Sequence, residues 1–153
     1  MGRLGTGDDA PDFSLENQDG REVSLASFSP GRVLVYFYPK DDTPGCTTEA
    51  RQFEEHSAGF KEAGIAVIGI SPDSAESHLG FKERHGLRFD LLCDPDHQVA
   101  EAYGAWGEKN RYGKKYFGII RSTFLVGPDG KIERAWYNVR AEGHAARVLA
   151  EAS

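Results

Sequence analysis

Residues 36–49 read YFYPKDDTPGCTTE, and in this segment an apolar strand gives way to a turn and then to a helix. Pro39 ends the strand, while Thr43 and Pro44 are residue types favoured at the N-cap and the first position of a helix. Cys46 then falls in the first helical turn, where unpaired backbone N–H groups and the helix dipole favour an anion. A helix terminus stabilises an anion by only about 0.3–2 kcal/mol, so we expect Cys46 to be a reactive thiolate that also needs a nearby arginine.

The runs on either side of this helix predict a βαβ unit. Residues 33–38 and 65–70 are continuous apolar segments, as in strands that are covered on both faces. The helix between them is expected to continue from Thr43 to Gly64. Such a unit places the start of the helix at the carboxyl end of a strand, which is the usual location of a site in an open α/β sheet.

The alternation of helices and strands then continues. The sequence predicts a helix from Ser74 that ends by Gly86, followed by a strand over residues 88–93. Residues 94–96 are expected to cap another helix, and residues 104–115 are expected to form a polar loop.

Hairpins at the two ends of the chain complete the pattern. An Asp-Gly pair between short alternating runs within residues 11–25 predicts an N-terminal β-hairpin that closes one edge of the sheet. A Gly-Pro-Asp-Gly turn joins strands over residues 121–126 and 132–137, and residues 143–152 form an amphipathic helix. The predicted fold class is therefore α/β, a thioredoxin-like fold whose mixed central β-sheet is flanked by helices on both faces.

The composition is that of a soluble, mildly acidic globule. The chain has 153 residues, of which 39% are hydrophobic and 27% charged, with a formal net charge of −6. These values predict a single domain over residues 1–153 and argue against a nucleic-acid partner, which would need a basic surface. No apolar run approaches the roughly 18 residues of a membrane span, so we expect no membrane association and a cytoplasmic location.

The cysteines and histidines suggest neither a disulfide scaffold nor a metal site. Cys46 and Cys93 are the only cysteines and form neither a Cys-x-x-Cys motif nor a zinc spacing, which fits a reducing compartment. The histidines are scattered, so we expect surface or capping roles for them, and no metal or cofactor. They are His56, His78, His85, His97 and His144.

Two separated motifs reveal a family resemblance. Pro39, Thr43 and Cys46, in the spacing P-x-x-x-T-x-x-C, together with RSTF at residues 121–124, resemble the motifs of the peroxiredoxins. The resemblance covers nearly the whole chain and is greatest to the peroxiredoxin Q or bacterioferritin comigratory protein branch. Further matching segments are residues 10–13, 94–97, 103–109 and 141–144. The resemblance implies a thiol-dependent peroxidase.

The same resemblance implies a role for each of five residues. Cys46 would be the peroxidatic nucleophile, Thr43 a hydroxyl that binds the peroxide, and Pro39 an apolar shield over the pocket. Arg121 would be the missing cation, which holds the thiolate charged and binds the peroxide oxygen. Glu49 would orient that arginine, with a solvated or capping glutamate as the alternative, just as plain N-capping is the alternative for Thr43.

The implied reaction needs a peroxide and a thiol reductant. Hydrogen peroxide or an organic hydroperoxide would oxidise Cys46 to a sulfenic acid, which thioredoxin or another external thiol would reduce. The chain departs from the branch at Arg51, where many relatives carry a resolving cysteine. Cys93 is a possible resolving thiol, a buried side chain in a one-cysteine cycle, or part of an intersubunit disulfide. The resemblance favours a monomer or a weak homodimer.

Other functional classes fit the sequence less well. A peroxide sensor or a redox-dependent holdase would use the same chemistry at Cys46 without efficient turnover, so turnover with a thiol reductant separates these readings. A dithiol oxidoreductase would need a second cysteine at position 49, which is glutamate. A cysteine hydrolase would need a histidine base oriented by Asn or Asp, and none of the histidines lies in such a motif.

Overall fold

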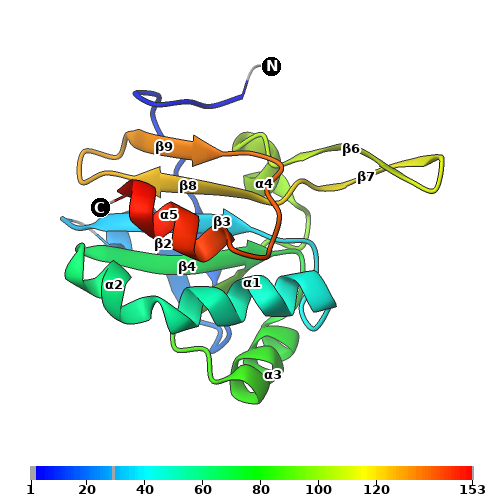
Figure 1. Cartoon of the computed structure of the whole chain (residues 1–153), viewed down its shortest axis with the longest axis horizontal. Helices are drawn as coiled ribbons and strands as arrows, with labels where there is room; N and C mark the ends of the chain where they lie inside the picture. Colours follow the sequence, from blue (N-terminus) through cyan, green and yellow to red (C-terminus); the bar gives the residue numbers. More distant parts are fainter. Residues whose placement is uncertain (1–2, 29, 153) are drawn as a thin grey trace.

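A five-stranded sheet in the order β5-β4-β3-β8-β9 forms the centre of the molecule in the computed structural model (Figure 1). The structure describes residues 3–28 and 30–152, so residues 1, 2, 29 and 153 of the expected domain lie outside the described residues. β3 runs parallel to β4 and antiparallel to β8, which confirms a mixed sheet. The strands are β3 (Arg32–Phe37), β4 (Ile65–Ser71), β5 (Asp90–Cys93), β8 (Ser122–Val126) and β9 (Ile132–Trp136).

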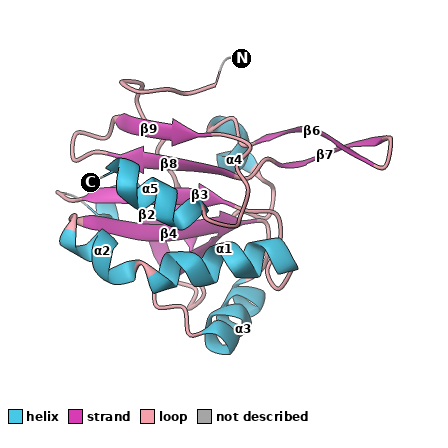
Figure 2. Cartoon of the chain, in the orientation of Figure 1, coloured by secondary structure: helices cyan, strands magenta, loops and turns pink. Residues whose placement is uncertain are grey.

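Helices cover both faces of this sheet, as predicted (Figure 2). Along β3, Leu34 and Tyr36 point to the face covered by α1, α2 and α5, whereas Val35 and Phe37 point to the opposite face with α4. Burial of one such side chain contributes about 1.5–3 kcal/mol. The helices are α1 (Pro44–Glu55), α2 (Ser57–Glu62), α3 (Ala75–His85), α4 (Gln98–Ala102) and α5 (His144–Ala152), with a short 3₁₀ turn, η1 (Leu25–Phe28).

The βαβ unit is confirmed, but its helix is not continuous. The predicted helix from Thr43 to Gly64 is divided into α1 and α2 at His56, whose φ and ψ of −96° and 12° leave the helical region. No proline or glycine stands at this position, so the sequence carries no breaker signal there. Phe53 and Phe60 still meet across the break, with ring centroids 5.9 Å apart.

The N-terminal hairpin closes the β5 edge of the sheet, as expected. Its strands, β1 (Ser14–Glu16) and β2 (Glu22–Ser24), pair antiparallel. An isolated bridge joins Asn17 to Leu92, and the Gln18 side chain accepts a hydrogen bond from the amide of Leu91 at 3.1 Å. These contacts pair backbone groups that would otherwise be exposed along β5.

The prediction of a polar loop over residues 104–115 is wrong, because this segment belongs to a second hairpin. β6 (Trp106–Arg111) pairs antiparallel with β7 (Lys114–Ile119). Tyr112 and Gly113, with φ of 54° and 78°, form the turn, and a two-residue turn with positive φ at both positions is the type I′ turn. Tyrosine is unusual there, and most side chains of both strands are exposed, so neither a turn signal nor a buried face marks the hairpin in the sequence.

The C-terminal elements are those the sequence predicts. β8 and β9 pair antiparallel around residues 127–130, and α5 packs on α1 and α2. Gly59 permits this packing, since a Cβ at that position would lie 2.5 Å from Cδ2 of Leu149. No helix within residues 3–28 and 30–152 is long and apolar enough to cross a membrane.

Candidate active site

Cys46 lies in the first turn of α1, as predicted. Thr43 is the N-cap with an extended backbone, Pro44 is the first helical residue, and the amide of Thr47 donates to the carbonyl of Thr43 at 2.9 Å. The backbone amides that precede Thr47 in this turn have no acceptor within the helix, so they favour a negative charge near them. Gly45 suits the crowded position beside the thiol, because a Cβ there would lie 3.2 Å from Nη2 of Arg121.

Arg121 is the cation in contact with the thiol. In the β3–β8 pairing Phe37 lies opposite Ser122, so the residue before β8 lies beside the end of β3, from which the chain turns into α1. Nη2 of Arg121 donates to Sγ of Cys46 at 3.3 Å. Burial lowers the pKa of Arg121, but the neighbouring Glu49 and Cys46 raise it by more, so the guanidinium remains charged.

Glu49 lies one helical turn after Cys46 and is fully buried, so the alternative of a solvated glutamate is wrong. Its Oε1 accepts a hydrogen bond from Nη1 of Arg121 at 2.5 Å, whereas Oε2 has no hydrogen-bond partner among the described residues. Burial raises the pKa of Glu49 to about 7, against the lowering effect of Arg121. The carboxyl group therefore changes its charge near neutral pH while in contact with the guanidinium.

Thr43 does not cap α1 with its side chain. Its hydroxyl makes no cap hydrogen bond and instead donates to the carbonyl of Lys40 at 2.8 Å, so the explanation of Thr43 as a side-chain cap is wrong. The bond holds the hydroxyl within the turn that precedes the helix. A hydroxyl that donates one hydrogen bond can still accept others through its lone pairs.

The thiol itself is less exposed than the charged segment before it suggests. Cys46 is only 2% exposed and Asp41 only 5%, although the neighbouring Lys40 and Asp42 are exposed. A cavity of about 450 Å³ adjoins the site and is lined by Pro39 and Arg121, among others. A larger cavity of about 640 Å³ lies between α1, α2 and β4, and its lining includes none of the candidate site residues.

Lys109 on β6 is a second cation near the thiol that the sequence analysis did not identify. It lines the cavity beside Arg121, and its Nζ donates to the carbonyl of Ile119 at 2.7 Å. Burial and the charge of Arg121 lower the pKa of Lys109, and the charge of Cys46 raises it in part. Only the hairpin brings Lys109 to the cavity, so this position could be predicted only by recognising β6.

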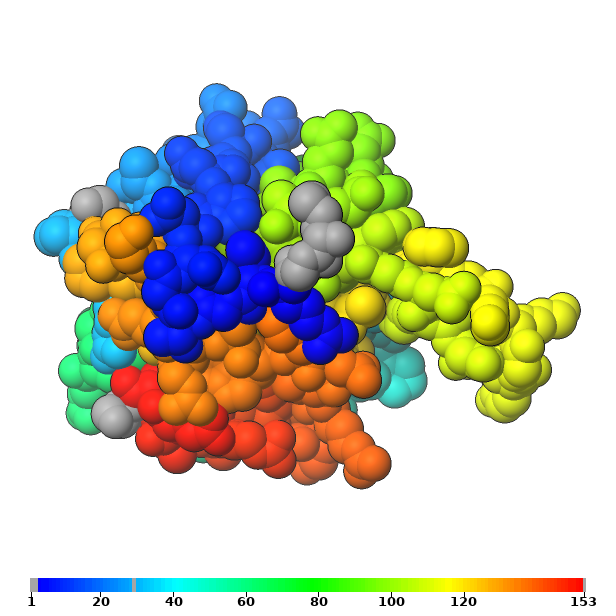
Figure 3. All heavy atoms as spheres, turned by 90° about the horizontal axis from the view of Figure 1, so that it is seen from above, coloured from blue at the N-terminus to red at the C-terminus, as the bar shows by residue number. Residues whose placement is uncertain are grey.

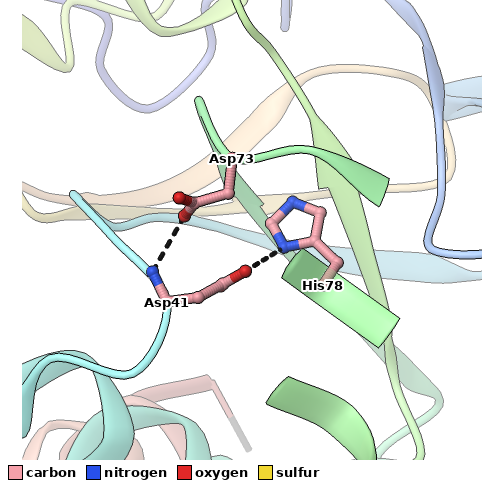
Figure 4. A group of neighbouring side chains, drawn as sticks. All are labelled: Asp41, Asp73 and His78. Atoms are coloured by element: carbon pink, nitrogen blue, oxygen red, sulfur yellow. Dashed lines mark hydrogen bonds and ion pairs between the residues drawn. The ribbon is translucent and has the colours of Figure 1, made fainter. Parts of the chain in front are cut away.

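A buried polar network ties the segment before α1 to α3 (Figure 4). Nδ1 of His78 lies 2.7 Å from Oδ2 of Asp41, whose amide donates to Oδ2 of Asp73 at 2.8 Å. The Tyr38 hydroxyl donates to the other oxygen of Asp41 at 2.6 Å. Asp41, Asp73 and His78 each offer an atom that could ligate a metal ion, and these atoms lie within 4.8 Å of one another. Each of the three side chains, however, already has hydrogen-bond partners in the chain.

Two of the histidines are not on the surface, which corrects the role expected for them. His78 and His144 are both fully buried. Nε2 of His144 lies 2.7 Å from the hydroxyl of Thr123. Burial lowers the pKa of His144 to about 4, so its ring is neutral at pH 7 and serves as part of the core.

Cys93 is not brought into contact with Cys46. It ends β5, where it pairs in register with Ser71, and both cysteines are free thiols. Burial, followed by the charge of Glu16, raises the pKa of Cys93 to about 11, so at pH 7 it is a protonated thiol. Arg51 is exposed on α1.

Comparison with known proteins identifies the family. The sequence profile of the AhpC/TSA family matches residues 6–135. The chain is 51% identical to a putative peroxiredoxin of Mycobacterium tuberculosis over 151 residues, which cover 99% of the chain and 96% of that protein. It is 48% identical to the peroxiredoxin Bcp of Escherichia coli over 149 residues, which cover 97% and 96%.

Solved structures agree with this assignment. The bacterioferritin comigratory protein of Xanthomonas campestris, described through its alkyl peroxide reduction activity, superposes with a TM-score of 0.89 at 38% identity, over 96% of each chain. PrxQ of Xylella fastidiosa gives a TM-score of 0.91 at 34% identity, over 99% of this chain and 96% of that one. The thioredoxin-like fold is thereby confirmed, and the chain belongs to the AhpC/TSA family as a peroxiredoxin of the Bcp or PrxQ group, a thiol peroxidase.

Proposed function

We propose that Cys46 is the peroxidatic nucleophile of this thiol peroxidase and that Arg121 is the cation that activates it. The observation that carries the proposal is the double contact of one guanidinium. Arg121 donates to Sγ of Cys46 from Nη2 and to the buried Glu49 from Nη1. A planar guanidinium fixed at both nitrogens cannot turn away from the thiolate, so its charge stays directed at the reacting atom.

In the proposed reaction the thiolate attacks one oxygen of the peroxide. A bond forms between Sγ of Cys46 and that oxygen as the O–O bond breaks, and the second oxygen leaves as an alkoxide or hydroxide that takes a proton to become alcohol or water. Sulfur is oxidised by two electrons to a sulfenic acid and the peroxide is reduced by two. Negative charge moves from sulfur to the leaving oxygen, and Arg121 has donors to stabilise it at both positions.

Thr43 and Pro39 complete the proposed site. Thr43 would hold the peroxide through its hydroxyl, which the Lys40 carbonyl positions, and Pro39 would limit the access of water from the cavity wall. The cavity of about 450 Å³ has room for an organic substituent as well as for hydrogen peroxide itself. The alkyl peroxide reduction described for the Xanthomonas campestris relative supports organic hydroperoxides as substrates.

We further propose that an external thiol, such as that of thioredoxin, closes the catalytic cycle. Position 51 is arginine, and the raised pKa of Cys93 leaves it a poor nucleophile at neutral pH, so Cys93 as the resolving thiol is the less favoured route. The enzyme is proposed to act as a single-domain monomer or weak homodimer in the cytoplasm, without nucleic-acid or membrane partners. The acidic composition and the small number of cysteines support this part of the proposal.

Intact-mass spectrometry after one equivalent of hydrogen peroxide tests the proposal, with and without dimedone. The expected result is a dimedone adduct in the wild type and in Cys93→Ser, and none in Cys46→Ser. A loss of about two daltons that either substitution abolishes would instead make Cys93 the resolving thiol. If Cys46→Ser consumed peroxide as fast as the wild type, the assignment of the nucleophile would be refuted.

A further inference from the structure

The β6–β7 hairpin projects from the body of the molecule as a two-stranded arm (Figure 3). The arm holds three of the four large hydrophobic side chains that are exposed in the described part of the chain: Tyr112 is 91% exposed, Phe117 65% and Tyr116 42%. A two-stranded hairpin is marginally stable in water, and these side chains remain exposed on it. Exposed aromatic groups that gather in this way are typical of interaction sites.

The charge of the arm is opposite to that of the whole chain. Its 14 residues, 106–119, include four basic side chains and one acidic one, whereas the chain carries a net charge of −6. Arg111 lies directly opposite Lys114 in the strand pairing. Like charges at facing positions destabilise a hairpin, so this arrangement does not serve the arm itself. The basic charge of the arm instead favours binding of an acidic surface on another protein.

The middle of β6 lines the cavity beside the candidate active site. Lys109 lies opposite Tyr116, so both side chains are on one face of the hairpin, and Lys109 also lines the cavity beside Arg121 and Pro39. A strand of six residues extends about 17 Å at roughly 3.4 Å per residue. A partner held along this face would therefore lie over the cavity that Arg121 and Pro39 line.

We propose that the arm is the docking site of the protein that reduces this peroxidase, an acidic protein with a reactive dithiol. The inference rests on the proposed function, because it assumes a sulfenic acid at Cys46 that an external thiol must reduce. A second copy of the chain is the weaker candidate for the occupant. Its thiols are the buried Cys46 and the half-buried Cys93, whose raised pKa makes it unreactive.

Docking would serve the reduction of the sulfenic acid at Cys46. The first thiolate of the reductant attacks Sγ of Cys46, an S–S bond forms, and the S–O bond breaks as hydroxide leaves and takes up a proton to become water. The second thiolate of the reductant then attacks its own first sulfur. Cys46 leaves as a thiolate, and the reductant leaves as a disulfide.

The test measures reduction of the oxidised enzyme by a purified bacterial thioredoxin, using Lys114→Glu/Lys115→Glu as the arm variant. The matched control, Lys61→Glu/Arg147→Glu, makes the same change of charge at exposed positions on α2 and α5. Because charge complementarity raises association rates by about 10- to 1,000-fold, we expect the arm variant to react with thioredoxin at least about 10-fold more slowly at low salt, with a smaller difference as salt is added. Oxidation by hydrogen peroxide and reduction by dithiothreitol should stay within about twofold of wild type.

A second measurement tests the arm without any peroxide. Reduced Cys46 attacks a single-cysteine thioredoxin that carries thionitrobenzoate as a mixed disulfide, and the release of thionitrobenzoate is followed. If release is slower in the arm variant but not in the control variant, the result supports docking. This holds even if Cys46 is not oxidised by peroxide and the proposed function is refuted. Wild-type rates with thioredoxin in both measurements overturn the inference. The inference is also overturned if the arm variant is slowed equally with dithiothreitol. It is overturned as well if the wild type and the control sediment as dimers and only the arm variant does not.

Discussion

Replacement of Glu49 by glutamine should make the stability of the protein less dependent on pH. The carboxyl group is fully buried and its pKa is raised from 4.5 to about 7, so the folded protein resists its ionisation. A carboxyl group of this kind favours folding most below its unfolded pKa. Its contribution is lost as pH rises toward the folded pKa, because the unfolded chain then gains more from ionisation than the folded one.

The size of this effect follows from the shift in pKa. A rise of roughly 2.5 units corresponds to about 3 kcal/mol, of which roughly 2.5 kcal/mol develops between pH 5 and pH 8. Since a domain of this size is stable by only about 5–15 kcal/mol, such a change is readily measured. The difference in stability between the wild type and Glu49→Gln should therefore shift by about 2–3 kcal/mol in favour of glutamine from pH 5 to pH 8.

Urea unfolding at several pH values measures this difference. The comparison is made in a Cys46→Ser background, which removes the titration of the thiol, and other ionisable groups largely cancel between the paired proteins. Glu55→Gln on the exposed side of the same helix is the control and should leave the pH profile unchanged. A Glu49→Gln difference that is constant from pH 5 to pH 8, or that grows in favour of glutamate, would refute the reasoning.

Three further outcomes are expected. Arg121→Lys keeps the charge but loses the two-sided contact, so the rate constant for oxidation of Cys46 by hydrogen peroxide, followed by stopped flow, should fall about 100- to 1,000-fold. Thr43→Val removes the hydroxyl at nearly constant volume and should slow the same step about 2- to 12-fold, since a neutral hydrogen bond contributes about 0.5–1.5 kcal/mol. His78→Leu leaves the buried Asp41 without its imidazole partner and should lower the free energy of unfolding by about 3 kcal/mol, measured by urea denaturation.

Each of these has a matched control. Arg134→Lys, at a partly exposed arginine of β9, should keep the wild-type oxidation rate. Thr43→Ser should restore most of the rate that Thr43→Val loses, because it restores the hydroxyl. His56→Leu, at a half-exposed position, should destabilise the protein by less than His78→Leu. The reasoning fails if Arg121→Lys reacts like wild type, if serine and valine at position 43 behave alike, or if the two histidine variants unfold together.

Patterns that depend on local chemistry could be predicted from the sequence. The apolar runs of β3 and β4 predict strands that are covered on both faces. The Thr-Pro-Gly-Cys motif predicts the first turn of α1, because preferences for the N-cap and the first turn are properties of single residues. The pairing of Arg121 with Cys46 came from the family resemblance. The antiparallel register of β3 and β8 supplies its physical basis.

What the sequence could not show depends on contacts between distant segments. The arm was not predicted because its side chains are largely exposed and show no alternation of apolar and polar residues. The position of Lys109 near the site was therefore not predicted either. The burial of Asp41 and His78 was missed because each is polar, and only hydrogen-bond partners from distant segments make burial tolerable. The burial of Glu49 likewise depends on a guanidinium that stands 72 residues later.

The register that brings Arg121 beside Cys46 also has a consequence during biosynthesis. The two residues are 75 positions apart, and at roughly 5–20 residues per second the ribosome adds Arg121 about 4–15 s after Cys46. Until β8 pairs with β3, the nascent chain carries the cysteine without the guanidinium. If Arg121 activates Cys46 as proposed, the thiol would acquire full sensitivity to peroxide only when the sheet closes, and the unfinished chain would be protected from oxidation.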